Sequence, residues 1–447
     1  MRPLPDTSPH IEPARYLTED IPPIGGAIKQ REEDFFVEEI PLYQPSGEGE
    51  HIYLMLEKRG MPSLELVGLV ARHFGVRRGD VGYAGLKDKH AVTRQVLSVY
   101  APGRAPESFP SLQHDRVSVL WVDRHTNKLR RGHLAGNRFS IRIRDVQPEA
   151  VITARRVLSV LAQRGVPDRV GEQRFGALRN NHLVGRALFI GDFGAAVDQL
   201  LGPPRLPGAV TANVEARAHF QQSEYNRARE LFPKSLRTER TVLGALARGA
   251  AAEAAIREVD PSVLGYYLSA FQSAVFNAAL DDRIAAGTLE TLLPGDIAVT
   301  HGRRNYFKVD DAVLNDPETA GRLERVELSP SGPMWGPDFQ RATGEPGEQE
   351  IGALRRFGLE PADLAGAPQL TSEMTSGDRR PYRVPVRNID VEGGVDEHGA
   401  YVRCAFDLPR GAFATTVMAE IMKPDRIEQA PEDQATTPPA GRDERPL

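Results

Sequence analysis

Short runs in which apolar and polar residues alternate dominate the first third of the chain. In residues 138–146, Phe139, Ile141 and Ile143 fall on one face of a strand and arginines fall on the other. Alternation with a period of two is typical of a β-strand that is buried on one side. The runs that predict strands are 28–40, 51–58, 81–85, 94–101, 116–122 and 138–146.

Two stretches in the same region repeat their apolar residues at helical spacing. The first begins at Ser63, a residue type that caps helix N-termini, and Gly75 is placed to end it. The second extends from Pro148 to Arg164, where Gly165 can cap the C-terminus. The residues predicted to be buried are Leu66, Val67, Val70 and Phe74 in the first helix, and Ile152, Val157, Leu158 and Leu161 in the second.

Beyond Gly165 the character of the chain changes to helical segments rich in alanine and leucine, such as 239–259 and 263–287. Strand patterns return at 383–393 and 401–409 and are followed by a short helical segment, 411–423. Strand-rich beginnings with inserted helices favour an α+β mixed sheet.

The returning strands also predict how the chain divides into domains. If they complete the first sheet, one domain is discontinuous, with residues 21–164 and 381–423, and residues 165–380 form an inserted domain. Residues 1–20 and 424–447 are rich in proline and acid and lack periodicity, so we predict that both ends are disordered.

Length and composition set broad limits on the protein. Its 447 residues, of which 40% are hydrophobic, suffice for two or three domains. No apolar run approaches the roughly 20 residues of a membrane-spanning helix, and no signal peptide is visible, so we expect a soluble cytoplasmic protein. The single cysteine, Cys404, excludes an intramolecular disulfide and a cysteine-rich zinc site, and the alternation around it predicts a buried strand position. The scattered histidines support no metal site.

The net charge of −5 hides an uneven distribution. Residues 424–447 carry six acidic residues and three arginines, a net charge of −3. Residues 124–144 carry seven lysines and arginines and no acid. That local excess of positive charge is the predicted contact surface for a phosphate backbone.

One loop combines charges in a way that suits catalysis. Asp88 lies between Lys87 and Lys89, with His90 directly after them. Nearby positive charge favours an ionised aspartate and attracts anionic substrates, and such a carboxylate can act as a nucleophile or a base. When the loop is considered alone, a solvated polar turn is the favoured interpretation. No Walker A, dinucleotide-binding, zinc-protease or G-x-S-x-G motif offers another catalytic centre.

With its neighbours, the segment YAGLKDKHAVTRQ resembles the signature of the TruD family of pseudouridine synthases, which isomerise uridine in RNA to its C-glycoside. The similarity extends from about residue 21 to residue 423, in family order. It implies a pseudouridine synthase-type mixed, largely antiparallel sheet with flanking helices, plus an inserted α/β domain specific to the family. The other matching segments are IKQREEDFFVEE, GEGEHIYLMLEKRG, HTNKLRRGHLAGNRFSIRIR, GVPDRVGEQRFG, YLSAFQSAVFN, SGPMWG and LPRGAFATTVMAEIM.

The resemblance also implies roles for individual residues. It places the catalytic aspartate on Asp88 and matches Lys29 and Phe35 with residues that line the active site. Asn137 matches an asparagine that helps to hold the catalytic loop, and Phe139 matches an aromatic residue that stacks on the target base. From the residues alone, a core position stays open for both Phe35 and Phe139.

Seven cationic or potentially cationic residues are candidates for contacts with RNA. The lysines among them can equally be ordinary surface residues, and the arginines can equally belong to a solvated face. For the histidine, a structural role in orienting the loop is favoured over proton transfer. These candidates are Lys87, Lys89, His90, Arg130, Arg131, Arg138 and Arg142.

The resemblance implies a tRNA substrate, with uridine 13 in the D-arm as the target. It implies no cofactor, metal, membrane or protein partner. Two alternatives are a tRNA-binding or tRNA-folding protein with little or no isomerase activity, and a different RNA-modifying enzyme. The intact motif around Asp88 disfavours the first, and the absence of methyl-donor, nucleotide and metal motifs disfavours the second.

The sequence departs from the family pattern at two places. Asp168, Arg169 and Val170 stand where the family usually has Asn-Tyr-Phe, and Glu32 stands where a proline is common. The first change removes two aromatic residues near the predicted domain junction. It therefore bears on RNA placement rather than on the chemistry of Asp88.

Overall fold

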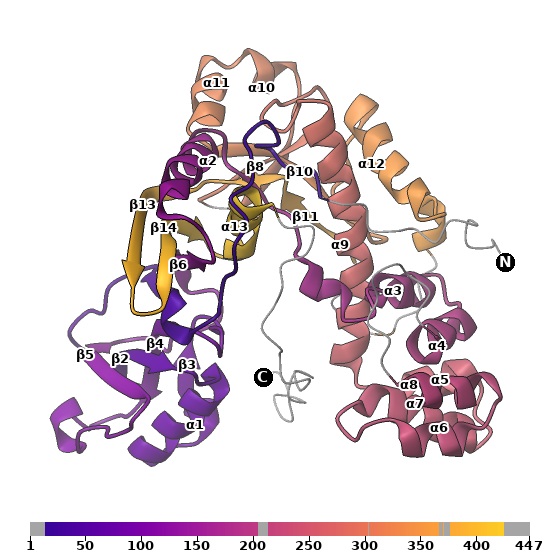
Figure 1. The fold of residues 1–447 in the computed structure, drawn as a ribbon, viewed down its shortest axis with the longest axis horizontal. Coiled ribbons are helices and arrows are strands. Elements are labelled where there is room, and N and C mark those ends of the chain that lie inside the picture. Colours follow the sequence, from indigo (N-terminus) through magenta and orange to yellow (C-terminus); the bar gives the residue numbers. More distant parts are fainter. Residues whose placement is uncertain (1–13, 204–212, 303, 366–369, 371–375, 424–447) are drawn as a thin grey trace. The chain divides into compact units, whose positions relative to one another are not determined.

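The structure is a computed structural model that describes residues 14–203, 213–302, 304–365, 370 and 376–423 (Figure 1). The described chain divides into two compact units. The first, which we call the sheet unit, contains residues 16–166 and 384–423, and the second, the helical unit, contains residues 14–15 and the described part of 167–383. Whether these units are the separate domains expected from the sequence stays a prediction.

The sheet unit is built on an eight-stranded sheet, counted over the described residues. The strand order is β13-β14-β6-β1-β4-β2-β5, and β3 pairs with β4. The strands are β1 (Phe35–Pro41), β2 (His51–Arg59), β3 (Val81–Tyr83), β4 (Val92–Tyr100), β5 (Val117–His125), β6 (Leu134–Arg144), β13 (Arg387–Asp396) and β14 (Gly399–Pro409). The β1–β4 pair is parallel, and the other named pairs in this sheet are antiparallel. The expectation of a mixed, largely antiparallel sheet is confirmed.

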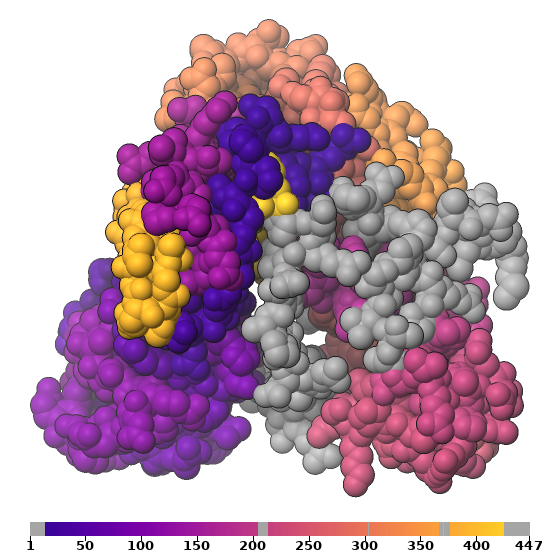
Figure 2. Space-filling view, in the orientation of Figure 1, coloured from indigo at the N-terminus to yellow at the C-terminus, as the bar shows by residue number. Residues whose placement is uncertain are grey.

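Three α-helices of the sheet unit cover apolar parts of the sheet (Figure 1). Helix α1 (Ser63–Phe74) packs with the apolar residues of β2 and β4 in one core cluster. Helices α2 (Val151–Arg164) and α13 (Ala414–Met422) pack in a second cluster with β1, β6 and β14. Figure 2 shows the β13–β14 hairpin, in yellow, at the surface of this unit beside its purple segments. The short 3-10 turns are η1 (Glu32–Asp34), η2 (Arg78–Asp80), η3 (Pro106–Ser108) and η4 (Pro148–Ala150).

The ends of helix α1 confirm one sequence prediction and correct another. Gly75 ends the helix in the left-handed conformation, with φ of 65°, as predicted. Ser63 is not the N-cap, because Pro62 takes that position and Ser63 is the first helical residue. Its hydroxyl group instead contacts the main chain of Lys87.

The predicted burial of helix α2 is wrong at one residue. Ile152 is 74% exposed, whereas Val157, Leu158 and Leu161 are fully buried as predicted. The buried stripe begins at Ala154, and a residue two positions earlier lies about 200° away around a helix, on the solvent side. Gly165 caps the helix as predicted, since its N–H donates to the carbonyl of Leu161.

The N-terminal segment also differs from its prediction. The strand expected from residue 28 begins at Phe35, because Lys29 has a left-handed φ of 59° and a 3-10 turn follows it. Residues 14–20, assigned from sequence to a disordered leader, are in part tied to helix α13. The N–H groups of Leu17 and Thr18 donate to the carboxylate of Glu420. Residues 1–13 and 424–447 lie outside the described residues.

The prediction for Cys404 is confirmed. The residue lies in β14 with no exposed surface. Burial raises the pKa of its thiol to about 12, so the thiol stays protonated and packs as an apolar side chain.

The longest described helix of the helical unit is α9 (Pro261–Ala285), which packs against α3 (Asn181–Phe189) (Figure 1). A four-stranded sheet has the order β11-β10-β8-β9, with β8 (Ile297–Thr300), β9 (Asn305–Lys308), β10 (Leu328–Met334) and β11 (Asp378–Pro381). The remaining elements are η5 (Glu172–Phe175), α4 (Phe193–Leu201), α5 (Val214–Gln221), α6 (Tyr225–Leu231), α7 (Arg237–Ala247), α8 (Ala252–Arg257), α10 (Asp311–Asn315), α11 (Pro317–Glu324), α12 (Gly344–Arg356) and η6 (Pro361–Leu364). The short strands β7 (Val166–Pro167) and β12 (Arg383–Val384) pair where the chain leaves and re-enters the sheet unit.

Candidate active site

The parallel pairing of β1 with β4 brings two loops to one edge of the sheet. Phe36 is the register partner of Val92, so both strands begin at the same edge. The segment before β1 carries Lys29, and the segment before β4 carries Asp88. The Lys29 ammonium lies 4.0 Å from the Asp88 carboxylate. Lys29 and Asp88, which are 59 positions apart in the sequence, therefore form a charged pair at the surface of the sheet unit.

The exposure of this pair suits contact with a substrate. The Asp88 side chain is 50% exposed, and that of Lys29 is 24% exposed. The Lys29 ammonium also lies 4.7 Å from the centre of the Phe35 ring. An accessible carboxylate held beside a cation can act on a bound base or sugar.

Phe35 and Phe139 lie close to each other but inside the core. They are 2% and 7% exposed, and their rings meet edge to face at 6.5 Å. Phe139 also packs against Phe406 of β14 at 5.7 Å. This is the core position that the sequence left open for both residues. In this structure the Phe139 ring is not free to stack on a base.

Asn137 lies on β6, two residues from Phe139, and pairs in register with Glu39 of β1 and Leu408 of β14. Its side-chain oxygen is buried and lacks a hydrogen-bond partner among the described residues. A buried acceptor without a partner is costly unless a further group donates to it. The structure therefore leaves this oxygen available to a donor from a ligand or from the Asp88 loop.

Lys87 does not fit its predicted role as an RNA contact. Its side chain is 5% exposed, and its ammonium lies 2.9 Å from the carboxylate of Glu39, which is itself 1% exposed. Burial raises the pKa of Glu39, and the charge of Lys87 opposes that shift. The pair is internal, so Lys87 anchors the loop instead of offering its charge to a phosphate.

Most of the other candidate RNA contacts are exposed, whereas the charge of Arg138 is partly compensated within the protein. Lys89, His90 and Arg130 are exposed at the surface. Arg131 is also exposed and donates to the hydroxyl of Tyr83. Arg138 is 43% exposed and pairs with Asp407, so part of its charge is already compensated.

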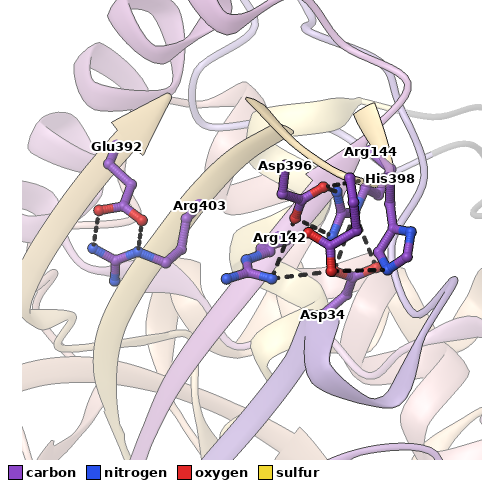
Figure 3. Close-up of polar contacts among 8 residues, drawn as sticks. Asp34, Arg142, Arg144, Glu392, Asp396, His398 and Arg403 are labelled. Atoms are coloured by element: carbon purple, nitrogen blue, oxygen red, sulfur yellow. Dashed lines mark hydrogen bonds and ion pairs between the residues drawn. The ribbon is translucent and has the colours of Figure 1, made fainter. Parts of the chain in front are cut away.

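Arg142 belongs to a larger charged network at the end of β6 (Figure 3). Its guanidinium lies 3.5 Å from Asp396, and the neighbouring Arg144 donates to both Asp34 and Asp396. Arg144 is 2% exposed and Asp34 has no exposed surface. We call Asp34, Arg142, Arg144 and Asp396 the arginine clamp. Since both arginines are engaged internally, Arg142 is a weaker candidate for RNA contact than Arg130.

The arginine clamp also fixes the segment that carries Lys29. The main chains of Ala27 and Arg144 exchange two hydrogen bonds, of 2.9 and 2.8 Å. The side chain of Gln30 donates to Asp145, and Asp34 accepts from Arg144. The turn around Lys29 is thereby attached to the end of β6 at both of its ends.

Three polar residues that support the Asp88 loop were not identified from the sequence as functional. Lys58 and Ser63 contact the main chain of the loop, and Glu39 holds Lys87. For Lys58 a signal did exist, because it continues the apolar positions 52, 54 and 56 along β2. A lysine on the buried face of a strand needs a partner inside the protein.

The two departures from the family pattern have structural explanations within their own units. In the helical unit, Asp168 accepts from Arg380, Arg169 pairs with Asp281, and the main chain of Val170 bonds to the Asn277 side chain. Burial raises the pKa of the Asp168 carboxyl to about 6, against the opposing charge of Arg380.

In the sheet unit, the Glu32 carboxylate lies against Gly60, where an added Cβ would approach it within 2.1 Å. The charge of Glu32 also raises the pKa of the nearby Lys58 ammonium, against the larger effect of burial. A proline at this position would not supply that negative charge.

No cluster of three or more histidine, cysteine or acidic side chains in the described ranges could hold a metal ion. None of the described helices has both the length and the apolar character that a membrane-spanning helix needs.

Comparisons with known proteins find similarity over nearly the whole chain. A family model described as tRNA pseudouridine synthase D (TruD) matches residues 13–421. A tRNA pseudouridine synthase D of Geobacter metallireducens is 43% identical over 417 residues, covering 92% of this chain and 98% of the relative. The relative of the same name from Thermus thermophilus is 34% identical, covering 95% of this chain and 98% of its own.

A solved structure described as a tRNA pseudouridine synthase D (TruD) from Methanosarcina mazei is similar in fold. Its TM-score is 0.78 at 27% identity, and the match covers 94% of this chain and 98% of that one. The resemblance first seen around Asp88 therefore extends through both units of the fold. The chain belongs to the TruD family of tRNA pseudouridine synthases.

Proposed function

We propose that this protein converts uridine to pseudouridine in tRNA, with uridine 13 of the D-arm as its target and the Asp88 carboxylate as its catalytic group. The observation that carries the catalytic assignment is the setting of Asp88. Its carboxylate is half exposed and 4.0 Å from Lys29, while its main chain is fixed from inside the protein. A fixed backbone with an accessible carboxylate suits a catalytic group.

The reaction itself needs no external reactant. The bond between the uracil nitrogen and the ribose breaks, the base turns, and a carbon of the ring forms the new glycosidic bond. The ring carbon gives up its proton and the nitrogen regains one, so atoms and electrons balance without a cofactor. Asp88 can assist by adding to the ring or the ribose, or by accepting the proton.

We further propose that Lys89, His90, Arg130 and Arg131 contribute to the surface that meets the tRNA. All four are exposed in the sheet unit, and positive charge near the loop attracts a phosphate backbone. A tRNA substrate also supports a cytoplasmic location, which we include in the proposal.

The first prediction tests the catalytic assignment. Pseudouridine is mapped in a tRNA pool treated with the wild-type protein, with Asp88→Asn, and with Asp115→Asn, whose aspartate is exposed in the loop before β5. The asparagine at position 88 keeps the size of the side chain but lacks its charge. We expect wild type and Asp115→Asn to modify uridine 13, and Asp88→Asn to lose at least about 100-fold in rate.

Each part of the proposal has its own contrary result. An Asp88→Asn variant as active as wild type would reject Asp88 as the catalyst. Modification of another uridine would reject the target position. A wild-type protein that binds tRNA and leaves every uridine unchanged would favour the tRNA-folding alternative.

A further inference from the structure

Lys58 is a lysine in an unusual environment for its charge. It lies near the end of β2, between Thr93 of β4 and Val117 of β5 in the strand register, and has no exposed surface. Burying an ammonium is costly unless hydrogen bonds and opposite charges compensate for its lost hydration. The position therefore requires a specific reason for a lysine.

The hydrogen bond made by Lys58 supplies that reason. Its ammonium donates to the main-chain carbonyl of Asp88 at 2.7 Å. Burial lowers the pKa of Lys58 to about 8, with the charge of Lys87 acting in the same direction. The charges of Asp88 and Glu32 oppose that shift. The lysine is thus paired with the proposed catalytic residue through both its main chain and its charge.

The preceding residue of the loop is fixed as well. The Ser63 hydroxyl accepts a hydrogen bond of 2.8 Å from the N–H of Lys87. Its single proton can be donated to the Lys87 carbonyl at 3.2 Å or to the Gln95 side chain at 3.1 Å. The Lys87 side chain is held by Glu39. The main chain on both sides of the peptide bond between residues 87 and 88 is therefore anchored to strands and to helix α1.

We propose that Lys58 is a positioning residue for the isomerisation, which holds the Asp88 main chain so that the carboxylate meets the reacting uridine in a fixed place. The inference rests on the proposed catalytic role of Asp88. Lys58 has no exposed surface and acts through Asp88, so its loss should slow the chemical step without weakening the binding of tRNA. A displacement of about 1 Å at a catalytic group can cost on the order of 100-fold in rate.

The second prediction compares full-length wild type with Lys58→Met and a matched control, Thr93→Val. Methionine keeps an unbranched side chain and removes the donor. Thr93 is the register partner of Lys58, equally buried, and its hydroxyl has no partner among the described residues. We expect Lys58→Met to lower kcat by about 10- to 100-fold with an unchanged Kd for tRNA, and Thr93→Val to keep the wild-type kcat.

A second variant, Lys58→Gln, tests the contact itself. It keeps an N–H donor without the charge, so we expect it to recover part of the kcat that Lys58→Met loses. Wild-type kcat in Lys58→Met, a loss confined to KM, or an equal loss in Thr93→Val would each overturn the inference. Should Lys58→Met fail to fold, a Lys58→Gln variant that weakens the binding of tRNA while keeping the wild-type kcat would overturn the inference as well. An active Asp88→Asn variant would instead reject the proposed catalyst, so the two failures are distinguishable.

Discussion

The arginine clamp and the Lys58 site are both buried charged groups in the sheet unit, yet their charges are balanced differently. Arg144 makes hydrogen bonds to two carboxylates, which raise its pKa further above the ordinary value. Lys58 makes one hydrogen bond to a neutral carbonyl, and burial lowers its pKa to about 8. The carboxylates of the clamp stabilise the charged form of Arg144. At the Lys58 site, by contrast, burial destabilises the charged form of the lysine. Such local costs tend to occur at functional sites.

The third prediction, with the largest expected effect on stability, removes the centre of the clamp. Arg144→Met leaves Asp34 buried without its main partner, so we expect the free energy of unfolding to fall by about 3–5 kcal/mol. Urea unfolding measures the change. The matched control is Arg403→Met, because Arg403 pairs with two more exposed residues of the β13–β14 hairpin, Asp390 and Glu392. Figure 3 shows the contact with Glu392.

For that exposed pair we expect a loss of no more than about 1 kcal/mol. Equal losses in Arg144→Met and Arg403→Met would remove the distinction between a buried clamp and a surface pair.

The fourth prediction uses pH to distinguish Lys58 from the clamp. As the pH rises through about 8, folded Lys58 loses its proton, while the unfolded chain keeps it up to the ordinary pKa of 10.5. The unfolded state then binds more protons, so the Lys58 contribution to stability rises with pH across this window, by an amount on the order of 3 kcal/mol.

Urea unfolding of wild type and Lys58→Met between pH 8 and 10.5 measures this contribution by difference. Lys58→Met lacks the titrating group, so the wild type should gain stability relative to it as the pH rises. Parallel pH curves for the two proteins would contradict a lowered pKa at Lys58. The groups that set this titration are Asp88, Lys87 and Glu32.

The fifth prediction concerns the acidic side of the clamp and has the smallest expected effect. Hydrogen bonds from Arg144 lower the pKa of Asp396 below its ordinary value of 3.8. Its stabilising contribution is therefore present above that value and is lost as the pH falls through the lowered pKa.

Thermal unfolding of wild type and Asp396→Asn checks this sign. We expect the variant to have a lower Tm at neutral pH and the two Tm values to converge in acid. A difference in Tm that persists unchanged at low pH would show that the Asp396 charge is not the stabilising feature.

The strand-rich unit and the Asp88 loop could be recognised from the sequence because both depend on local patterns. Alternation located the strands around Phe139 and Cys404, and the motif around Asp88 is continuous in sequence. The buried residues that hold the Asp88 loop were not identified from the sequence, because Lys58 and Ser63 contact the loop only after the strands have paired. No spacing rule relates a lysine on β2 to a carbonyl thirty residues later.

Strand β10 shows a different limit of sequence analysis. Its sequence LSPSGPM contains two prolines and a glycine, which favour loops, yet six of its seven residues are buried. Its neighbours β8 and β11 and helix α9 supply the packing that local propensity does not.

The residues of the arginine clamp come from distant parts of the sequence, and this separation has a consequence while the ribosome synthesises the protein. Arg144 and Asp396 are 252 positions apart, and residues 167–383, which include most of the helical unit, are translated between them. Until the β13–β14 hairpin emerges, β6 has an unpaired edge and Arg144 has only one of its two acidic partners. The nascent chain must therefore carry an incomplete sheet through most of its translation, and the turn that presents Lys29 reaches its final stability only near the end.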